Sequence, residues 1–113
     1  MNGDFLVLQS TFDKAVTAYK VNKLNQAEKF FVSILKKNPN HLETIFYLSM
    51  IALKNREFDK AKILSQKAIK INPNFAEAHH NLGQSFKDLG ENEKAIASYK
   101  EAIKIKPNLF ASY

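Results

Sequence analysis

Residues 73–108 read PNFAEAHHNLGQSFKDLGENEKAIASYKEAIKIKPN, and this stretch decides the fold. It begins and ends with Pro-Asn, and the two prolines lie 34 residues apart. On either side of Gly90 the apolar residues recur every three or four positions, which is the pattern of one helix face. Pro107 lacks a backbone donor and clashes with the preceding turn, so a helix has to end near Ile105. The stretch therefore predicts two amphipathic helices joined by a turn.

The same pattern occurs three times along the chain, at a spacing of 34 residues. Each set of equivalent positions keeps one kind of residue: Pro39, Pro73 and Pro107; Ala27, Ala61 and Ala95; Lys36, Lys70 and Lys104; Leu35, Ile69 and Ile103; and the small Ala15, Ser49 and Gly83. A single helix pair leaves its apolar face uncovered, so such repeats have to stack on one another. The sequence predicts an all-α chain of six helices in three pairs, plus the start of a seventh helix.

The residues of the third repeat resemble the tetratricopeptide repeat, which has a period of 34 residues. The resemblance rests on the following residues: Leu82, Gly83, Phe86, Ala95, Tyr99, Ala102 and Pro107. The second repeat has Ser65 where the family favours an aromatic residue, and the first has Lys14 where the family favours leucine. A lysine there suits an end repeat, whose outer face meets water.

This resemblance implies a right-handed α-solenoid of three helix–turn–helix units. We expect residues 1–7 to form an N-terminal extension leading into the first helix, capped by Asp4. Three repeats then span residues 8–41, 42–75 and 76–109, and residues 110–113 begin a truncated fourth repeat. The chain is then either part of a longer protein or self-associates through its uncapped C-terminal repeat.

Composition narrows the classes of protein that the chain can belong to. It has no cysteine, no signal-like N-terminus and no stretch that could span a membrane, and we expect a cytoplasmic protein. The net charge of +6 comes from lysines on the second helices, and Arg56 is the one arginine. Base and phosphate recognition favour arginine, so we interpret these lysines as a solvated outer face and do not expect nucleic-acid binding.

No residue pattern in the chain points to catalysis. Gly3, Gly83 and Gly90 are isolated, so there is no glycine-rich phosphate loop. His79 and His80 are adjacent and point about 100° apart on a helix, so they cannot share a metal ion on that helix. We therefore expect no enzyme activity within these residues, no cofactor and no metal site.

The resemblance also implies that the first helix of each repeat lines a concave groove. We expect this groove to bind a peptide or helix of a partner protein, through Phe12, Val16, Tyr19, Glu43, Phe46, Tyr47, Met50, Lys54, His80, Asn81 and Gln84. Aromatic residues and methionine carry binding energy in such sites. The alternative occupants of the groove are the chain's own segment 1–7 and a second copy of the chain.

One branch of the family grips the C-terminal carboxylate of chaperones with a clamp of lysine, asparagine and arginine. The corresponding positions here hold Phe12, Val16, Tyr47, Glu77 and Asn81, and only Asn81 matches. Because Glu77 would repel a carboxylate, we do not expect this mode of binding. The alternative to an interaction scaffold is a recruiting or regulatory arm of a larger enzyme, for example a transferase that continues after Tyr113.

Overall fold

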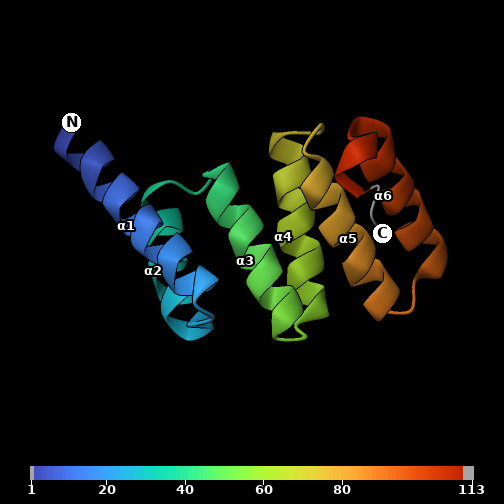
Figure 1. The fold of residues 1–113 in the computed structure, drawn as a ribbon, viewed down its shortest axis with the longest axis horizontal. Coiled ribbons are helices and arrows are strands. Elements are labelled where there is room, and N and C mark those ends of the chain that lie inside the picture. Colours follow the sequence, from blue (N-terminus) through green and yellow to red (C-terminus); the bar gives the residue numbers. More distant parts are fainter. Residues whose placement is uncertain (1, 111–113) are drawn as a thin grey trace.

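The structure is a computed structural model that describes residues 2–110, and this part of the chain is helical with no strand. The helices are α1 (Asn2–Lys20), α2 (Leu24–Lys37), α3 (Leu42–Lys54), α4 (Phe58–Ile71), α5 (Ala76–Asp88), α6 (Asn92–Ile105) and the 3-10 helix η1 (Pro107–Phe110). Figure 1 shows the helix pairs stacked along the long axis, with α1 and α2 at one end and α6 at the other. The predicted α-solenoid of six helices is confirmed.

The predicted start of the first helix needs correction. α1 begins at Asn2, so residues 2–7 are its first turns rather than a separate extension, and Asp4 lies in the first turn instead of capping it. A carboxylate there still stabilises the helix, because it faces the positive end of the helix dipole. α2 begins at Leu24, and α5 ends at Asp88 with Leu89 as its C-cap. Of the expected fourth repeat at residues 110–113, only Phe110 lies within the described residues.

The turn inside each repeat has the same backbone geometry. Asn22, Arg56 and Gly90 occupy equivalent positions and have φ values of 63°, 60° and 81°. The next residue donates its N–H back across the turn in each case: Lys23 to the carbonyl of Ala18, Glu57 to that of Ala52 and Glu91 to that of Phe86, all at 2.8 Å. This left-handed C-cap satisfies carbonyl groups that the helix end would leave unpaired.

The two helices of each pair cross at small residues. Ala15, Ala27, Ala61 and Ala95 are buried there, as are Ser49 and Gly83. At Gly83 the approach is so close that an added Cβ would lie 2.8 Å from two ring carbons of Tyr99. Only a residue without a side chain fits there without displacing that ring.

Stacking of the pairs buries three apolar clusters in sequence along the molecule. The first centres on Phe31 and joins α1, α2 and α3, and the second centres on Ile45 and joins α3, α4 and α5. The third joins α5 and α6 around Phe86. α3 is buried on two sides, because apolar residues nearly surround it. Within residues 2–110 no helix has both the length and the apolarity to cross a membrane.

We predict that Gly83→Leu lowers the free energy of unfolding by about 1–3 kcal/mol, because the new side chain overpacks the crossing of α5 and α6. Gly3→Leu is the matched control, since an added Cβ at Gly3 meets nothing within 4 Å. Thermal or urea denaturation of both variants measures the difference. Equal midpoints for Gly83→Leu and the wild type would contradict the position assigned to Gly83.

Candidate functional site

A hollow of about 350 Å³ lies where the three first helices meet. It is lined by Tyr19 of α1, by Met50, Leu53 and Lys54 of α3, and by Gln84 and Asp88 of α5. Four of these residues belong to the predicted groove, and the structure brings them together from all three repeats. Leu53 and Asp88 complete the lining. They occupy the repeat positions of Tyr19 and Lys54, which is why the 34-residue period places them on the same face.

Aromatic rings form the floor of the groove beside this hollow. Tyr47 stacks on Phe31 with 5.1 Å between ring centroids, and it contacts the edges of Phe12 and Tyr19 at 6.0 and 5.3 Å. Phe46 packs against Phe75 at 4.9 Å. Such edge and stacked pairs stabilise the fold beyond simple area burial. Phe12, Val16, Tyr19 and Tyr47 therefore belong to the first apolar cluster and hold the floor in place.

Tyr19 lies between methionine and lysine at one side of the hollow. Its hydroxyl donates to Met50 Sδ at 3.7 Å, and the Lys54 ammonium lies 5.1 Å from the centroid of its ring. Burial, followed by the neighbouring Tyr47, raises the pKa of the Tyr19 phenol. The hydroxyl is therefore neutral at physiological pH. The Lys54 ammonium is exposed and lies over an apolar surface. This arrangement suits a ligand that places an acidic group beside an apolar side chain.

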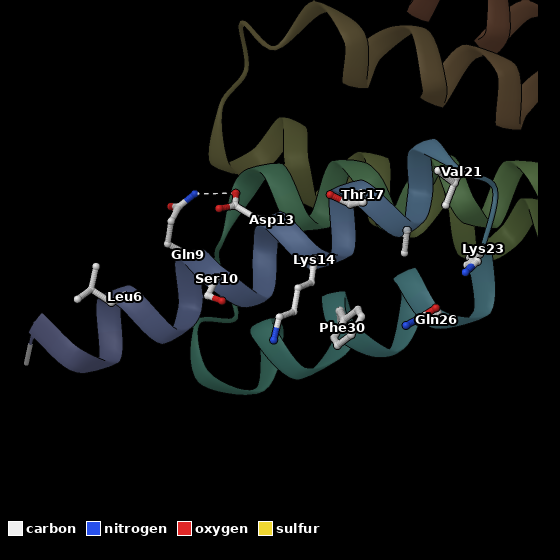
Figure 2. A pocket seen from close by; sticks show the side chains of 11 residues that line it. Leu6, Gln9, Ser10, Asp13, Lys14, Thr17, Val21, Lys23, Gln26 and Phe30 are labelled. Carbon is white, nitrogen blue, oxygen red and sulfur yellow. Dashed lines mark hydrogen bonds between the residues drawn. The ribbon is translucent and has the colours of Figure 1, made fainter.

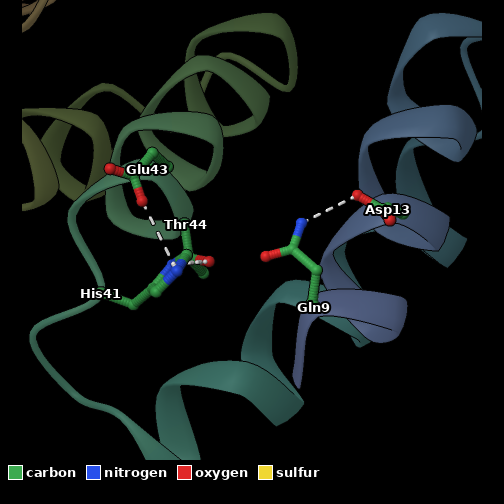
Figure 3. Close-up of polar contacts among 5 residues, drawn as sticks. All are labelled: Gln9, Asp13, His41, Glu43 and Thr44. Carbon is green, nitrogen blue, oxygen red and sulfur yellow. Dashed lines mark hydrogen bonds and ion pairs between the residues drawn. The ribbon is translucent and has the colours of Figure 1, made fainter. Parts of the chain in front are cut away.

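The opposite side of the groove is polar and acidic. Figure 3 shows Gln9 and Asp13 on α1 opposite the start of α3, where His41, Glu43 and Thr44 lie. Gln9 Nε2 donates to Asp13 Oδ1 at 3.2 Å, and His41 Nε2 lies 3.5 Å from Glu43 Oε2. The His41 ring also contacts Phe12 at 5.3 Å. His41, which precedes α3, therefore covers part of the aromatic floor.

The polar side chains that the third repeat contributes are mostly engaged in contacts within the protein. Asn81 is buried and donates from Nδ2 to Ser49 Oγ at 3.1 Å, while Ser49 Oγ donates to the Phe46 carbonyl. Gln84 Nε2 donates to Asp88 Oδ2 at 3.2 Å. His80 is half-buried against Tyr99, with ring centroids 5.4 Å apart. Asn81 therefore joins two repeats, and Gln84 is the predicted residue of this helix that reaches the hollow.

The chain's own N-terminal segment does not cover the groove. Residues 2–7 continue the axis of α1, and Phe5, Leu6 and Val7 are 66%, 63% and 55% exposed. A continuous helix cannot fold back on the floor, so this alternative is wrong for the described residues. Occupation by a second copy stays open.

A larger hollow of about 660 Å³ lies outside the groove, on the side of α1 and α2 away from the stack (Figure 2). Gln9 and Asp13 line it, and they therefore border both this hollow and the polar side of the groove. Ser10, Lys14 and Thr17 also line it. The equivalent residues of the second repeat, Thr44, Leu48 and Ile51, are buried against the preceding pair. Polar residues at these positions are what an exposed end of a solenoid requires. We therefore assign this hollow to the end face of the stack and not to the binding site.

The other end of the stack exposes apolar residues. Ile96 and Ile103 of α6 are 53% and 50% exposed, whereas Leu35 and Ile69, which share the position of Ile103, pack against the following pair. Self-association through this face stays a prediction. On the outer face, Lys60 pairs with Glu28 at 2.9 Å, while Lys36, Lys70 and Lys104 are exposed. The expectation that this face binds no nucleic acid also stays a prediction.

The side chains described between residues 2 and 110 include no group of three or more histidines and carboxylates that could hold a metal ion. The absence of enzyme activity stays an expectation from the sequence.

Comparison with known protein families shows to which family the chain belongs. Two models described as tetratricopeptide repeat match residues 42–75 and 76–109, which together make up more than half of the chain. The chain belongs to the tetratricopeptide repeat family. A comparison with curated proteins finds no match.

Several solved structures, some of them tetratricopeptide repeat (TPR) domains, have the same fold. A mutant O-GlcNAc transferase of Thermobaculum terrenum superimposes with a TM-score of 0.88 at 22% identity, over 92% of this chain and 20% of the transferase. The TPR domain of Arabidopsis OM64 gives 0.85 at 22% identity, over 89% and 84% of the two chains. The first TPR domain of Spaghetti (RPAP3), bound to an HSP90 peptide, gives 0.86 at 17% identity, over 91% and 82%. At these identities the likeness concerns the fold alone. The chain spans a fifth of the transferase and 56% of a similar MamA protein.

We predict that His80 makes the fold less stable as the pH falls. Burial lowers the pKa of its imidazole below the ordinary 6.5. The unfolded chain therefore binds the proton first, and stability is lost as the pH falls through about 6.5 towards the lower pKa of the folded state. Urea unfolding from about pH 8 to about pH 5 should show a smaller loss for His80→Gln than for the wild type. His41 and His79 are present in both proteins, so parallel curves would contradict this role of His80.

Proposed function

We propose that this protein is an interaction scaffold that binds a peptide or helix of a partner protein in the groove of its first helices. The observation that carries the proposal is the hollow formed jointly by Tyr19, Met50, Leu53 and Gln84 beside the aromatic floor. Apolar pockets next to a few placed polar groups are the usual form of peptide-binding sites. Because three repeats contribute, the hollow exists only in the assembled stack. A cytoplasmic location is part of the proposal.

Solved relatives support this use of the fold. Two TPR domains of Spaghetti (RPAP3) are described as bound to an HSP90 peptide. The clamp for chaperone tails does not carry over to this chain, because Phe12 and Tyr47 are apolar and Asn81 already donates to Ser49. Glu77 is engaged by Lys106, with 3.7 Å between Oε2 and Nζ. The proposed ligand is therefore held by apolar anchors rather than by its terminal carboxylate.

Met50→Glu tests the proposal by placing a carboxylate in the floor of the hollow. Ile63→Glu is the matched control, since Ile63 of α4 is 62% exposed and outside the groove. We predict that a partner captured from lysate by the wild type is also captured by Ile63→Glu. Met50→Glu should capture it at least about tenfold less, because burying a charge opposite an apolar anchor costs more than about 1.4 kcal/mol.

Both variants have to show the wild-type helix content and melting behaviour before capture is compared. Equal recovery of every partner by Met50→Glu and Ile63→Glu would move the function away from the groove. Loss with both variants would point to the outer face.

An alternative is that these repeats form the recruiting or regulatory arm of a larger enzyme. One observation favours it, namely that the chain aligns with a fifth of a transferase over most of its own length. Sequencing the gene beyond Tyr113 separates the two possibilities. A stop codon directly after Tyr113 would remove the alternative.

A further inference from the structure

Two rows of opposite charge border the aromatic floor. Glu43 lies in the first turn of α3, and Asp13 lies about two turns before the end of α1, beside the polar side chains in Figure 3. Lys20 and Lys54 lie two to three turns further along the same helices, where Lys54 borders the hollow. All four side chains are exposed. The groove of the first two repeats therefore has an acidic edge, an apolar floor and a basic edge.

The repeat explains where the basic row ends. Lys20 and Lys54 occupy the same position of the first and second repeats, and Asp88 occupies that position in the third. The basic row therefore stops at the second repeat. Those two repeats also supply the aromatic floor, so charge and apolar surface frame the same segment of the groove.

These charges are largely free to meet a ligand. Among residues 2–110, Lys20 and Lys54 form no ion pair, and Asp13 bonds only to the neutral amide of Gln9 at 3.2 Å. Glu43 has His41 as its neighbour, at 3.5 Å. A partner that brings charges of the opposite sign would not have to break a strong internal ion pair.

The distance between the acidic and basic rows favours a helical ligand. Glu43 and Lys54 are eleven residues apart on one helix, which is about 16 Å at 1.5 Å per residue, and Asp13 and Lys20 are about 10 Å apart. An α-helix with its side chains is about 10–12 Å wide, so a helix laid across α1 and α3 fills the space between the rows.

An extended peptide meets these surfaces less well. Its side chains alternate between two opposite faces, so it can face the floor or the two edges but not all three. A helix has side chains all round its axis and can present a different chemical face to each surface.

We propose, on the basis of the function proposed above, that the ligand is an amphipathic helix with an apolar stripe, basic residues along one side of the stripe and acidic residues along the other. Its basic side faces Asp13 and Glu43, and its acidic side faces Lys20 and Lys54. Reversing the helix would exchange its sides, so the two rows also fix the direction in which the ligand lies.

Three synthetic helical peptides test the charge pattern. They share one apolar stripe and carry Lys and Glu on opposite flanks, Lys on both, or Glu on both. In calorimetric titrations at low salt, the mixed peptide should bind roughly five- to tenfold tighter than either of the others, since each wrong flank replaces surface ion pairs by repulsion. Tightest binding of the all-Glu peptide would mean that the net charge of +6 governs affinity, and would overturn the proposal.

Reversal of the basic row supplies a second test. In Lys20→Glu/Lys54→Glu both edges are acidic, and the all-Lys peptide should become the tightest ligand. Lys36→Glu/Lys70→Glu makes the same charge change at exposed positions of the outer face. This control variant should rank the three peptides by affinity as the wild type does. An unchanged order in the first variant, or the same change in both variants, would overturn the assignment of the basic row.

A fourth peptide tests the helical form of the ligand. It carries the mixed flanks with two solvent-facing residues replaced by proline, and it should bind at least about tenfold more weakly because proline breaks the helix. Equal affinity would overturn the helical ligand. If the three helical peptides bind equally, the proposed charge pattern is overturned while binding in the apolar groove is still supported. If none of them binds, the groove itself is not the binding site.

Discussion

The close crossing of the two helices in each repeat is the contact on which the rest of the molecule depends. Small residues let the backbones approach, and at Gly83 the space is already filled by the ring of Tyr99. With the crossing filled in this way, the larger apolar side chains lie on the outside of the pair, where only another pair can cover them. Stacking follows, and it aligns α1, α3 and α5 so that their remaining faces form one surface. The groove therefore results from the same helix packing that buries the core.

The groove floor belongs to the core as much as to the site. Phe12 and Tyr47 contact Phe31, which is fully buried, so their rings are fixed before any partner arrives. Binding to such a floor requires little ordering of the protein, which lowers the entropic cost of association. Selectivity then rests on the groups at the edges, which are exposed and can differ without disturbing the fold.

Much of this architecture could be predicted from the sequence, because its signals are local. The ends of α2, α4 and α6 follow from Pro39, Pro73 and Pro107, and the 34-residue period gives the face on which each groove residue lies. The start of α1 was misjudged, since a carboxylate such as Asp4 suits both a cap and a first turn. Burial within the groove could not be predicted. Asn81 bonds to Ser49, 32 residues away in the sequence, and the ring of His41 contacts that of Phe12. Neither contact can be predicted from the spacing of residues along the chain.

The hydrogen bond from Asn81 to Ser49 gives the two joints of the solenoid different mechanical properties. A hydrogen bond weakens steeply when its angle changes, whereas apolar rings can slide over one another at small cost. The second and third repeats are joined by this buried bond, whereas the first joint combines aromatic rings with the weak bond from Tyr19 to Met50 and the exposed pair of Lys60 and Glu28. We therefore expect a change in the pitch of the superhelix to begin at the first joint. The second and third repeats would then move together while the first repeat opens or closes.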